Sequence, residues 1–322
     1  MPEELSKALA GRYVIEREVG RGGMATVHLA RDVRSGRLVA LKVLHPQLAF
    51  TLGADRFARE IRLAARLDHP NILRVLDSGD VDGQLWFAMA YVEGETLWDR
   101  LQRERQLSSA EALRITRATA SALAYAHKQG VVHRDIKPDN ILLSGDEVLV
   151  ADFGVARALS EVQSKLTATG MLVGTPTYMS PEQASGELNL DGRSDIFALA
   201  CVLYEMLAGE PPFKGPTPQM TLMLRLMHPA RPLRPMVSVT EAVESAILRG
   251  LAKDPADRWA TASLFADALE GRLPAPPPPE PEAPVAVADA TTSPRPRWPW
   301  VAGATAIAVA VAAVARRVFR RR

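Results

Sequence analysis

Short runs of β-forming residues, separated by turns, fill the first part of the chain. The runs with a strand-like pattern are residues 13–15, 26–29 and 38–43. A turn is predicted at residues 34–36, which contain Ser35 and Gly36. Between residues 56 and 67 the apolar positions change to a helical spacing, and Pro70 ends that pattern. We therefore predict a strand-rich lobe with one helix over residues 13–89.

Helical spacing dominates the next part of the chain. The helical patterns cover residues 110–127, 194–208, 241–252 and 263–269. No internal repeat is visible. A strand-rich lobe followed by a helical lobe, over residues 93–269, is an α+β arrangement of two lobes.

The composition changes abruptly at Gly271. Residues 271–297 are rich in proline and alanine, which predicts an extended linker without a core. Residues 298–315 are uncharged, and as a helix they would be about 27 Å long, close to the thickness of a bilayer core. We predict a transmembrane helix there, followed by a basic tail over residues 316–322.

Two features of this C-terminal segment favour alternatives. Eight of the 18 residues are alanine, which inserts less readily than leucine, so an amphipathic or soluble alanine-rich helix is an alternative. The arginines of the tail also oppose the positive-inside preference if the preceding domain stays in the cytoplasm. A helix that enters the bilayer and returns, or a basic tail bound to the membrane surface, would remove that conflict.

The bulk composition narrows the class of protein. Seven arginines near the C-terminus contribute to the net charge of +2, so removing them leaves −5 for the rest of the chain and no sign of a nucleic-acid groove. The single Cys201 cannot form a disulfide within the chain, as expected in a reducing compartment. The first ten residues lack the apolar run of a signal peptide. We expect most of the chain to lie in the cytoplasm.

Four motifs in order carry the chemistry. Residues 133–140 place the carboxylate of Asp135, the ammonium of Lys137 and the carboxamide of Asn140 in one short loop, as phosphoryl transfer requires. Upstream lie a glycine-rich turn over residues 20–27 and Lys42 in a strand-like run. Downstream, Asp152 follows an apolar run and precedes Phe153 and Gly154. These motifs over residues 13–269 resemble the bacterial-type, eukaryote-like serine/threonine protein kinases.

That resemblance implies an ATP site between the lobes. Lys42 corresponds to the lysine that contacts the phosphates, Glu60 is its partner on the predicted helix, and Met89 limits the adenine pocket. Ala25 stands where a third glycine is usual. The residues implied to bind ATP are Val19, Gly20, Arg21, Gly22, Gly23, Met24, Ala25, Thr26, Val27, Ala40, Lys42, Met89, Ala90 and Val92.

The resemblance also assigns the catalytic and metal-binding groups. Asp135 accepts or orients the proton of the attacking hydroxyl, and Lys137 screens charge on the transferred phosphoryl group. Asn140 and Asp152 hold Mg²⁺, with Mn²⁺ as an alternative ion. The partners implied are ATP, protein substrates with serine or threonine hydroxyls, the membrane through the C-terminal helix, and a second copy through the N-terminal lobe.

The segment after Gly154 resembles an activation loop. Thr167 and Thr169 are the candidate phosphorylation sites, and a phosphate there would pair with Arg134. Thr175 is expected to help bind the substrate by bonding Asp135 and Lys137. Glu182 is expected to pair with Arg258, and Asp195 to cap the backbone of the catalytic loop.

Two other functions compete with a protein kinase. A membrane-tethered pseudokinase scaffold is disfavoured because Lys42, Asp135 and Asp152 are all present, as are Glu60 and Asn140. A kinase of small molecules shares the loop chemistry but usually lacks a segment like residues 175–182.

Overall fold

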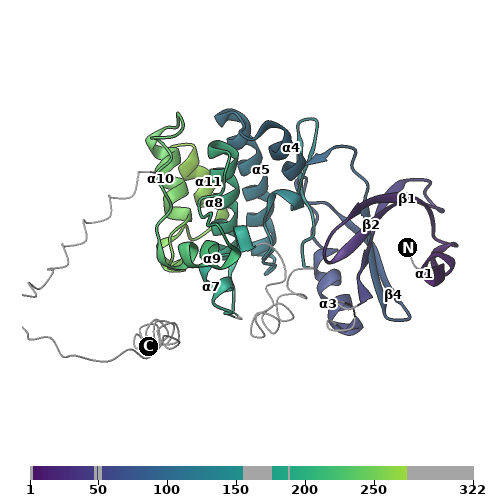
Figure 1. Ribbon diagram of the computed structural model, residues 1–322. Coiled ribbons are helices and arrows are strands. Elements are labelled where there is room, and N and C mark those ends of the chain that lie inside the picture. Colours follow the sequence, from purple (N-terminus) through teal and green to yellow (C-terminus); the bar gives the residue numbers. More distant parts are fainter. Residues whose placement is uncertain (1–2, 47–48, 50–52, 155–175, 188, 274–322) are drawn as a thin grey trace, which may run out of the picture. The chain divides into compact units, whose positions relative to one another are not determined.

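Five antiparallel strands build the N-terminal lobe of the computed structural model, which describes residues 3–46, 49, 53–154, 176–187 and 189–273 (Figure 1). Their order in the sheet is β1-β2-β3-β5-β4, and every neighbouring pair is antiparallel. The strands are β1 (Tyr13–Arg21), β2 (Ala25–Asp32), β3 (Leu38–Leu44), β4 (Val75–Val81) and β5 (Gln84–Ala90). Along β3 buried and half-buried side chains alternate, as the period of two in a strand requires.

Of the helices with described bounds, α1 and α3 accompany this sheet. The helix α3 (Ala54–Ala64) buries Phe57, Ile61 and Ala64, so the predicted helix is confirmed, with its start two residues earlier and its end three residues earlier than expected. The pattern did not predict α1 (Glu3–Leu9), whose Leu5 and Leu9 pack in a small core with Trp86. A single turn between Leu5 and Leu9 is too short a pattern to stand out in the sequence.

A small second sheet leads into the helical lobe. It contains β6 (Glu95–Thr96), β7 (Ile141–Ser144) and β8 (Glu147–Val150) in the order β6-β7-β8. The short helix α4 (Leu97–Glu104) begins at Thr96, whose side chain accepts a hydrogen bond from the amide of Asp99.

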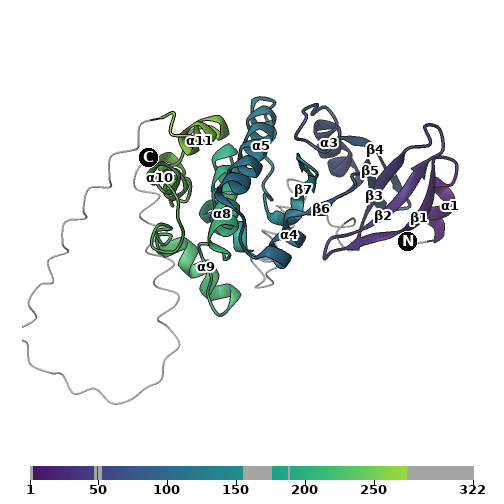
Figure 2. The ribbon, with the colours of Figure 1, turned by 90° about the horizontal axis from the view of Figure 1, so that it is seen from above.

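Helices dominate the C-terminal lobe. They are α5 (Ser109–Lys128), α7 (Pro181–Ala184), α8 (Gly192–Ala208), α9 (Pro218–Met227), α10 (Glu241–Gly250) and α11 (Ala262–Leu269), with 3-10 turns η1 (Pro138–Asn140), η2 (Pro176–Tyr178) and η3 (Pro255–Asp257). The helix α8 lies beside α5 and is buried continuously from Ser194 to Leu207, so it is the centre of this lobe (Figure 2). The predicted two-lobed α+β fold is therefore confirmed.

The C-terminal predictions concern residues that the structure does not describe. The linker, the transmembrane helix and the basic tail all lie within residues 271–322, of which only 271–273 are described. Among the described helices, none is long and apolar enough to cross a membrane.

Candidate active site

The loop between α5 and β7 brings together three groups predicted to act in phosphoryl transfer. Lys137 Nζ lies 2.7 Å from Asp135 Oδ2. Asn140 Nδ2 donates to the Asp135 carbonyl oxygen at 2.8 Å and to Asp135 Oδ2 at 3.1 Å. Burial alone lowers the pKa of Lys137, but the Asp135 carboxylate raises it overall, so the ammonium stays charged. The carboxylate of Asp135 is thus oriented by two neighbours within five residues.

Asp195, in the first turn of α8, holds the backbone of this loop. Its Oδ2 accepts from the His133 amide at 2.8 Å, and its Oδ1 accepts from the Arg134 amide at 2.7 Å. Burial alone would raise the pKa of Asp195, but a hydrogen bond from His127 and its other contacts keep that pKa below its ordinary value. The predicted capping contact is present. It supports the left-handed backbone of Arg134, which has φ of 69°.

His133 connects the catalytic loop to the strand that precedes Asp152. Its Nδ1 accepts a hydrogen bond from the Asp135 amide at 3.2 Å, so Nε2 carries the proton and donates to the Ala151 carbonyl oxygen at 2.8 Å. The His133 ring also meets Phe153 edge-on, with 4.6 Å between the ring centroids. Two motifs separated in the sequence are therefore bonded directly.

Lys42 bridges the two lobes. It lies in the middle of β3, and its ammonium forms an ion pair with Asp152 Oδ2. Burial alone would raise the pKa of Asp152, but Lys42 lowers it overall, so the carboxylate is ionised. The pairing of Lys42 with Glu60 stays a prediction, and the ion pair with Asp152 joins Lys42 to the segment after β8. Glu60 is buried on α3, and its backbone oxygen lies close to Gly154.

The glycine-rich turn joins β1 to β2. The Gly22 amide donates to the Ala25 carbonyl at 2.9 Å, and a Cβ on Gly22 or Gly23 would meet no atom closer than 3.9 Å. His45, just after β3, donates its amide to the Met24 carbonyl at 2.9 Å, and its ring lies 3.2 Å from the Gly23 carbonyl. The space beside these two glycines is therefore not filled by other atoms, which is compatible with a phosphate-binding turn.

The predicted adenine-side residues lie where β5 leaves the N-terminal lobe. Met89 is buried and pairs with Ala40 across β3 and β5. Ala90 is the last residue of β5, and both Ala90 and Val92 are half-buried. The structure therefore brings Met89 next to Ala40, which precedes Lys42 by two residues in β3.

The segment after the activation loop is anchored by a buried ion pair. Arg258 Nη1 and Nη2 donate to Glu182 Oε1 and Oε2, both at 2.7 Å, and Ser194 Oγ donates to Oε1 at 2.6 Å. The sequence predicted the pair of Glu182 and Arg258, and the structure contains it. By contrast, Thr167, Thr169 and Thr175 lie outside the described residues.

Three contacts around the loop have no counterpart in the motifs of the sequence. His127 Nε2 donates to Asp195 Oδ2 at 2.8 Å, Gln183 Nε2 donates to the Arg134 carbonyl at 2.8 Å, and Tyr178 donates to Glu205. None of these residues stands in a spacing that points to its partner. The contacts arise from the tertiary fold.

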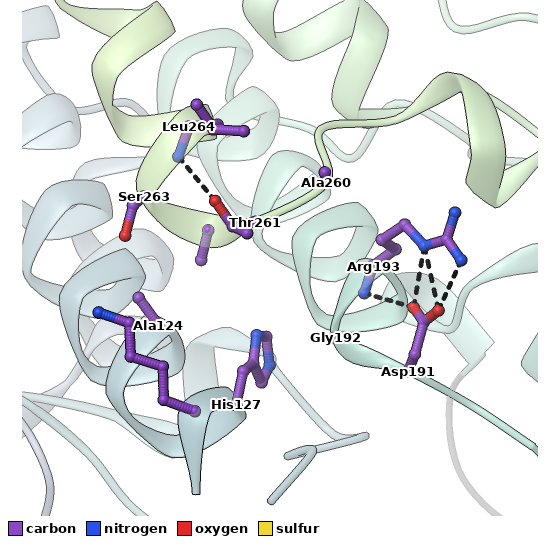
Figure 3. A pocket seen from close by; sticks show the side chains of 11 residues that line it. Ala124, His127, Asp191, Gly192, Arg193, Ala260, Thr261, Ser263 and Leu264 are labelled. Carbon is purple, nitrogen blue, oxygen red and sulfur yellow. Dashed lines mark hydrogen bonds and ion pairs between the residues drawn. The ribbon is translucent and has the colours of Figure 1, made fainter. Parts of the chain in front are cut away.

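His127 also lines a cavity of about 710 Å³ at the end of α5 (Figure 3). The N-terminal ends of α8 and α11 form its other walls, with Asp191 and Arg193 bonded to each other at one side. The residues predicted to bind ATP, metal or substrate do not line this cavity. It is separate from the candidate active site.

The two lobes, the shared Lys42–Asp152 contact and the loop around Asp135 define the protein kinase fold. The family model described as the protein kinase domain matches residues 13–270, and the chain belongs to that family.

Curated relatives agree with this family. The chain is 42% identical over 280 residues to serine/threonine-protein kinase PknB of Mycolicibacterium smegmatis. The matched region covers 83% of this chain and 44% of that protein. It is 42% identical over 284 residues to serine/threonine-protein kinase PknJ of Mycobacterium bovis, covering 85% of this chain and 47% of that protein. The chain therefore spans less than half the length of these relatives.

Among solved structures, the crystal structure of Rad53 residues 1–466 in complex with AMP-PNP is similar, with a TM-score of 0.67. The match covers 83% of this chain and 69% of that chain at 24% identity. At that identity the likeness shows the fold.

Proposed function

We propose that this chain is an ATP-dependent serine/threonine protein kinase, which transfers the γ-phosphate of ATP to hydroxyl groups of proteins. The observation that carries the proposal is the orientation of Asp135 by Lys137 and Asn140, in a loop bonded through His133 to the segment of Asp152. The names of the relatives, which share about 42% identity over the same region, support the serine/threonine class.

Each group has a distinct task in this reaction. Asp135 orients the substrate hydroxyl and accepts its proton, while Lys137 screens the charge on the transferred phosphoryl group. Lys42 and the backbone amides of the glycine-rich turn bind the phosphates, and Glu60 is the partner that holds Lys42 in place. Catalysis then comes mainly from positioning and from charge stabilisation.

The donor atoms at Asn140 and Asp152 fit Mg²⁺, with Mn²⁺ as the alternative ion. Asn140 directs its amide nitrogen to Asp135, which leaves the oxygen Oδ1 for a cation. One carboxylate and one amide oxygen suit an ion that takes its other ligands from phosphates and water. The described residues contain no cluster of three histidine, cysteine, aspartate or glutamate side chains that would hold a metal by itself. When bound, the ion neutralises charge on the phosphates.

The test is transfer from radiolabelled ATP to myelin basic protein by the wild type and by Asp135→Asn. We expect transfer by the variant to fall about 10²- to 10⁴-fold, the usual contribution of a general base, with an unchanged melting temperature. A wild type that transfers no phosphate would instead support a pseudokinase scaffold.

Regulation by autophosphorylation at Thr167 and Thr169 is part of the proposal. Arg134 is half-buried beside Asp135, where a phosphate on the activation loop would pair with it and order the loop. Phosphopeptide mapping after incubation with ATP tests this idea. Active enzyme with both threonines unmodified would rule it out.

We also propose an anchored arrangement in which residues 13–269 are the catalytic domain, residues 271–297 a linker, residues 298–315 a membrane-spanning helix and residues 316–322 a basic tail. The kinase domain then faces the cytoplasm, where ATP is available, and takes part in membrane-linked signalling.

The remaining proposed partner is a second copy of the chain, which would bind through the N-terminal lobe to form a homodimer. Exposed Val14, Val33 and Leu76 on that lobe supply apolar surface for it. Sedimentation of Leu76→Asp against the wild type tests the contact, and identical masses at every concentration would contradict it.

A further inference from the structure

The helix α9 is attached to the C-terminal lobe in an unusual way. Its one buried residue is Arg225, whose side chain has no exposed surface, while Met220, Met223 and Met227 face outward. A surface helix normally buries apolar side chains and exposes charged ones. In α9 the apolar Leu224 is only half-buried against the core and the fully buried position belongs to a charged side chain, so the buried arginine needs a reason.

Arg225 has few compensating contacts. Its Nη2 donates to the backbone carbonyl of Thr177, and its guanidinium lies 6.0 Å from the ring centroid of Phe213. Its Nε and Nη1 are buried and have no hydrogen-bond partner among the described residues. A buried charge without a carboxylate partner costs free energy, and an apolar side chain of similar volume would often be as stable or more so.

Lys253 offers a useful comparison at the same ring. Its Nζ lies 3.8 Å from the centroid of Phe213 and also has no hydrogen-bond partner among the described residues. Burial lowers the pKa of Lys253 to about 8. The two side chains share Phe213, but the bond to Thr177 belongs to Arg225.

Thr177 begins a chain of contacts that reaches the catalytic loop. The next residue, Tyr178, is held by its hydrogen bond to Glu205 of α8. Ser180 then starts α7, where Gln183 accepts from the Ser180 amide and donates to the Arg134 carbonyl. Arg134 directly precedes Asp135. The position of Thr177 is thus linked to the backbone that presents the catalytic carboxylate.

We propose that Arg225 is a positioning residue for the protein substrate: it holds the Thr177 carbonyl and so fixes the segment that leads into Tyr178 and α7. This inference rests on the proposed kinase function. According to this proposal, α9 fixes the position of the substrate-binding segment, residues 177–183, relative to the catalytic loop. The buried guanidinium costs free energy, and on this account the arginine serves to position the segment and does not stabilise the fold.

The test compares Arg225→Met, Arg225→Lys and the matched control Lys253→Met. Both methionine variants remove one buried charge beside Phe213, so both are expected to melt at or above the wild-type temperature. Only Arg225→Met should raise KM for myelin basic protein, by about ten-fold, as expected for loss of one charged hydrogen bond. KM for ATP should stay unchanged, and Arg225→Lys, which keeps a charged donor, should recover part of the loss.

A second measurement does not need activity. Hydrogen exchange of the backbone amides over residues 177–183 should become faster in Arg225→Met and stay as in the wild type in Lys253→Met. Wild-type KM and wild-type exchange in Arg225→Met would overturn the inference, as would equal effects of both methionine variants. Failure of the kinase proposal would look different, because the wild type itself would then transfer no phosphate.

Discussion

Glu182 and Arg258, 76 residues apart in the chain, form a two-pronged ion pair with both N···O distances at 2.7 Å. Arg258 is almost fully buried, and its Cζ atom lies 4.9 Å from the centroid of the Phe197 ring. The pair ties the segment after the activation loop to the turn before α11. Because both groups are removed from water, each depends on the other to offset its desolvation.

Removing one member of that pair should be costly. We expect Glu182→Ala to lower the free energy of unfolding by about 3 to 5 kcal/mol, because it leaves Arg258 charged and buried without a partner. Urea unfolding measures the change. The control is Asp267→Ala, which breaks the more exposed pair with Arg272 and should cost about 1 kcal/mol or less. Equal losses in the two variants would contradict this account.

The same pair predicts how stability depends on pH. Burial alone would raise the pKa of Glu182, but hydrogen bonds from Arg258 lower it below the ordinary value. As the pH falls, the unfolded chain therefore binds a proton at this glutamate before the folded chain does. The contribution of the Glu182 carboxylate to the free energy of unfolding is complete above the ordinary glutamate pKa of about 4.3. It is lost as the pH falls from there through the lower pKa of the folded state.

Urea unfolding from neutral pH down to about pH 3 measures this loss. Asp195, whose pKa is also lowered, adds to it, whereas Glu205, whose pKa burial raises, works in the opposite direction. Glu182→Gln should flatten the acid side of the profile. A variant as sensitive to acid as the wild type would refute the assignment.

Lys42→Met should impair phosphate transfer more than stability. The change removes the ammonium that pairs with Asp152, so the pKa of Asp152 should rise and the phosphates lose a cation. We expect kcat/KM to fall about 10²- to 10³-fold, as for loss of one charge-stabilising group. Lys214→Met, which removes an exposed lysine 3.6 Å from Glu210, is the control and should match the wild type.

Gly154 and Gly145 form a matched pair of glycines in the left-handed backbone region. A Cβ on Gly154 (φ 80°) would lie 3.0 Å from the Glu60 backbone oxygen, whereas a Cβ on Gly145 (φ 55°) would meet nothing within 4 Å. We expect Gly145→Ala to cost about 1 to 2 kcal/mol from the backbone alone, with normal transfer. Gly154→Ala should also move Asp152 against α3 and reduce transfer, as steady-state kinetics would show.

Two deletions test the membrane proposal. Removing residues 298–322 should move the kinase from the membrane fraction to the soluble fraction with its activity intact, because the proposed span is lost. Removing only residues 316–322 should leave it in the membrane fraction. Release by the shorter deletion would point to a basic tail bound at the membrane surface. A full-length protein that is already in the soluble fraction would contradict the proposed membrane anchor.

The secondary structure and the motifs of this protein are determined by residues that are close together in the sequence. Strands, helices and the order of the motifs follow from apolar spacing and from side chains within a few positions of one another, such as Asp135, Lys137 and Asn140. For that reason the two-lobed fold could be predicted, and helix ends differed from expectation by only a few residues. The pair of Glu182 and Arg258 and the capping by Asp195 were predicted too, but through resemblance to a family and not through spacing.

The contacts between distant segments were decided by the tertiary structure. Lys42 pairs with Asp152, 110 residues away in the chain, and the spacing of the two residues gives no sign of that contact. Arg225 is buried in a helix whose sequence gives no reason to bury a charge, and His127 bonds Asp195 without any motif that joins them. Apolar periodicity reports which face of an element is buried, but it carries no information on which charged groups meet there. Those meetings depend on how the elements pack, and they set the geometry of the proposed active site.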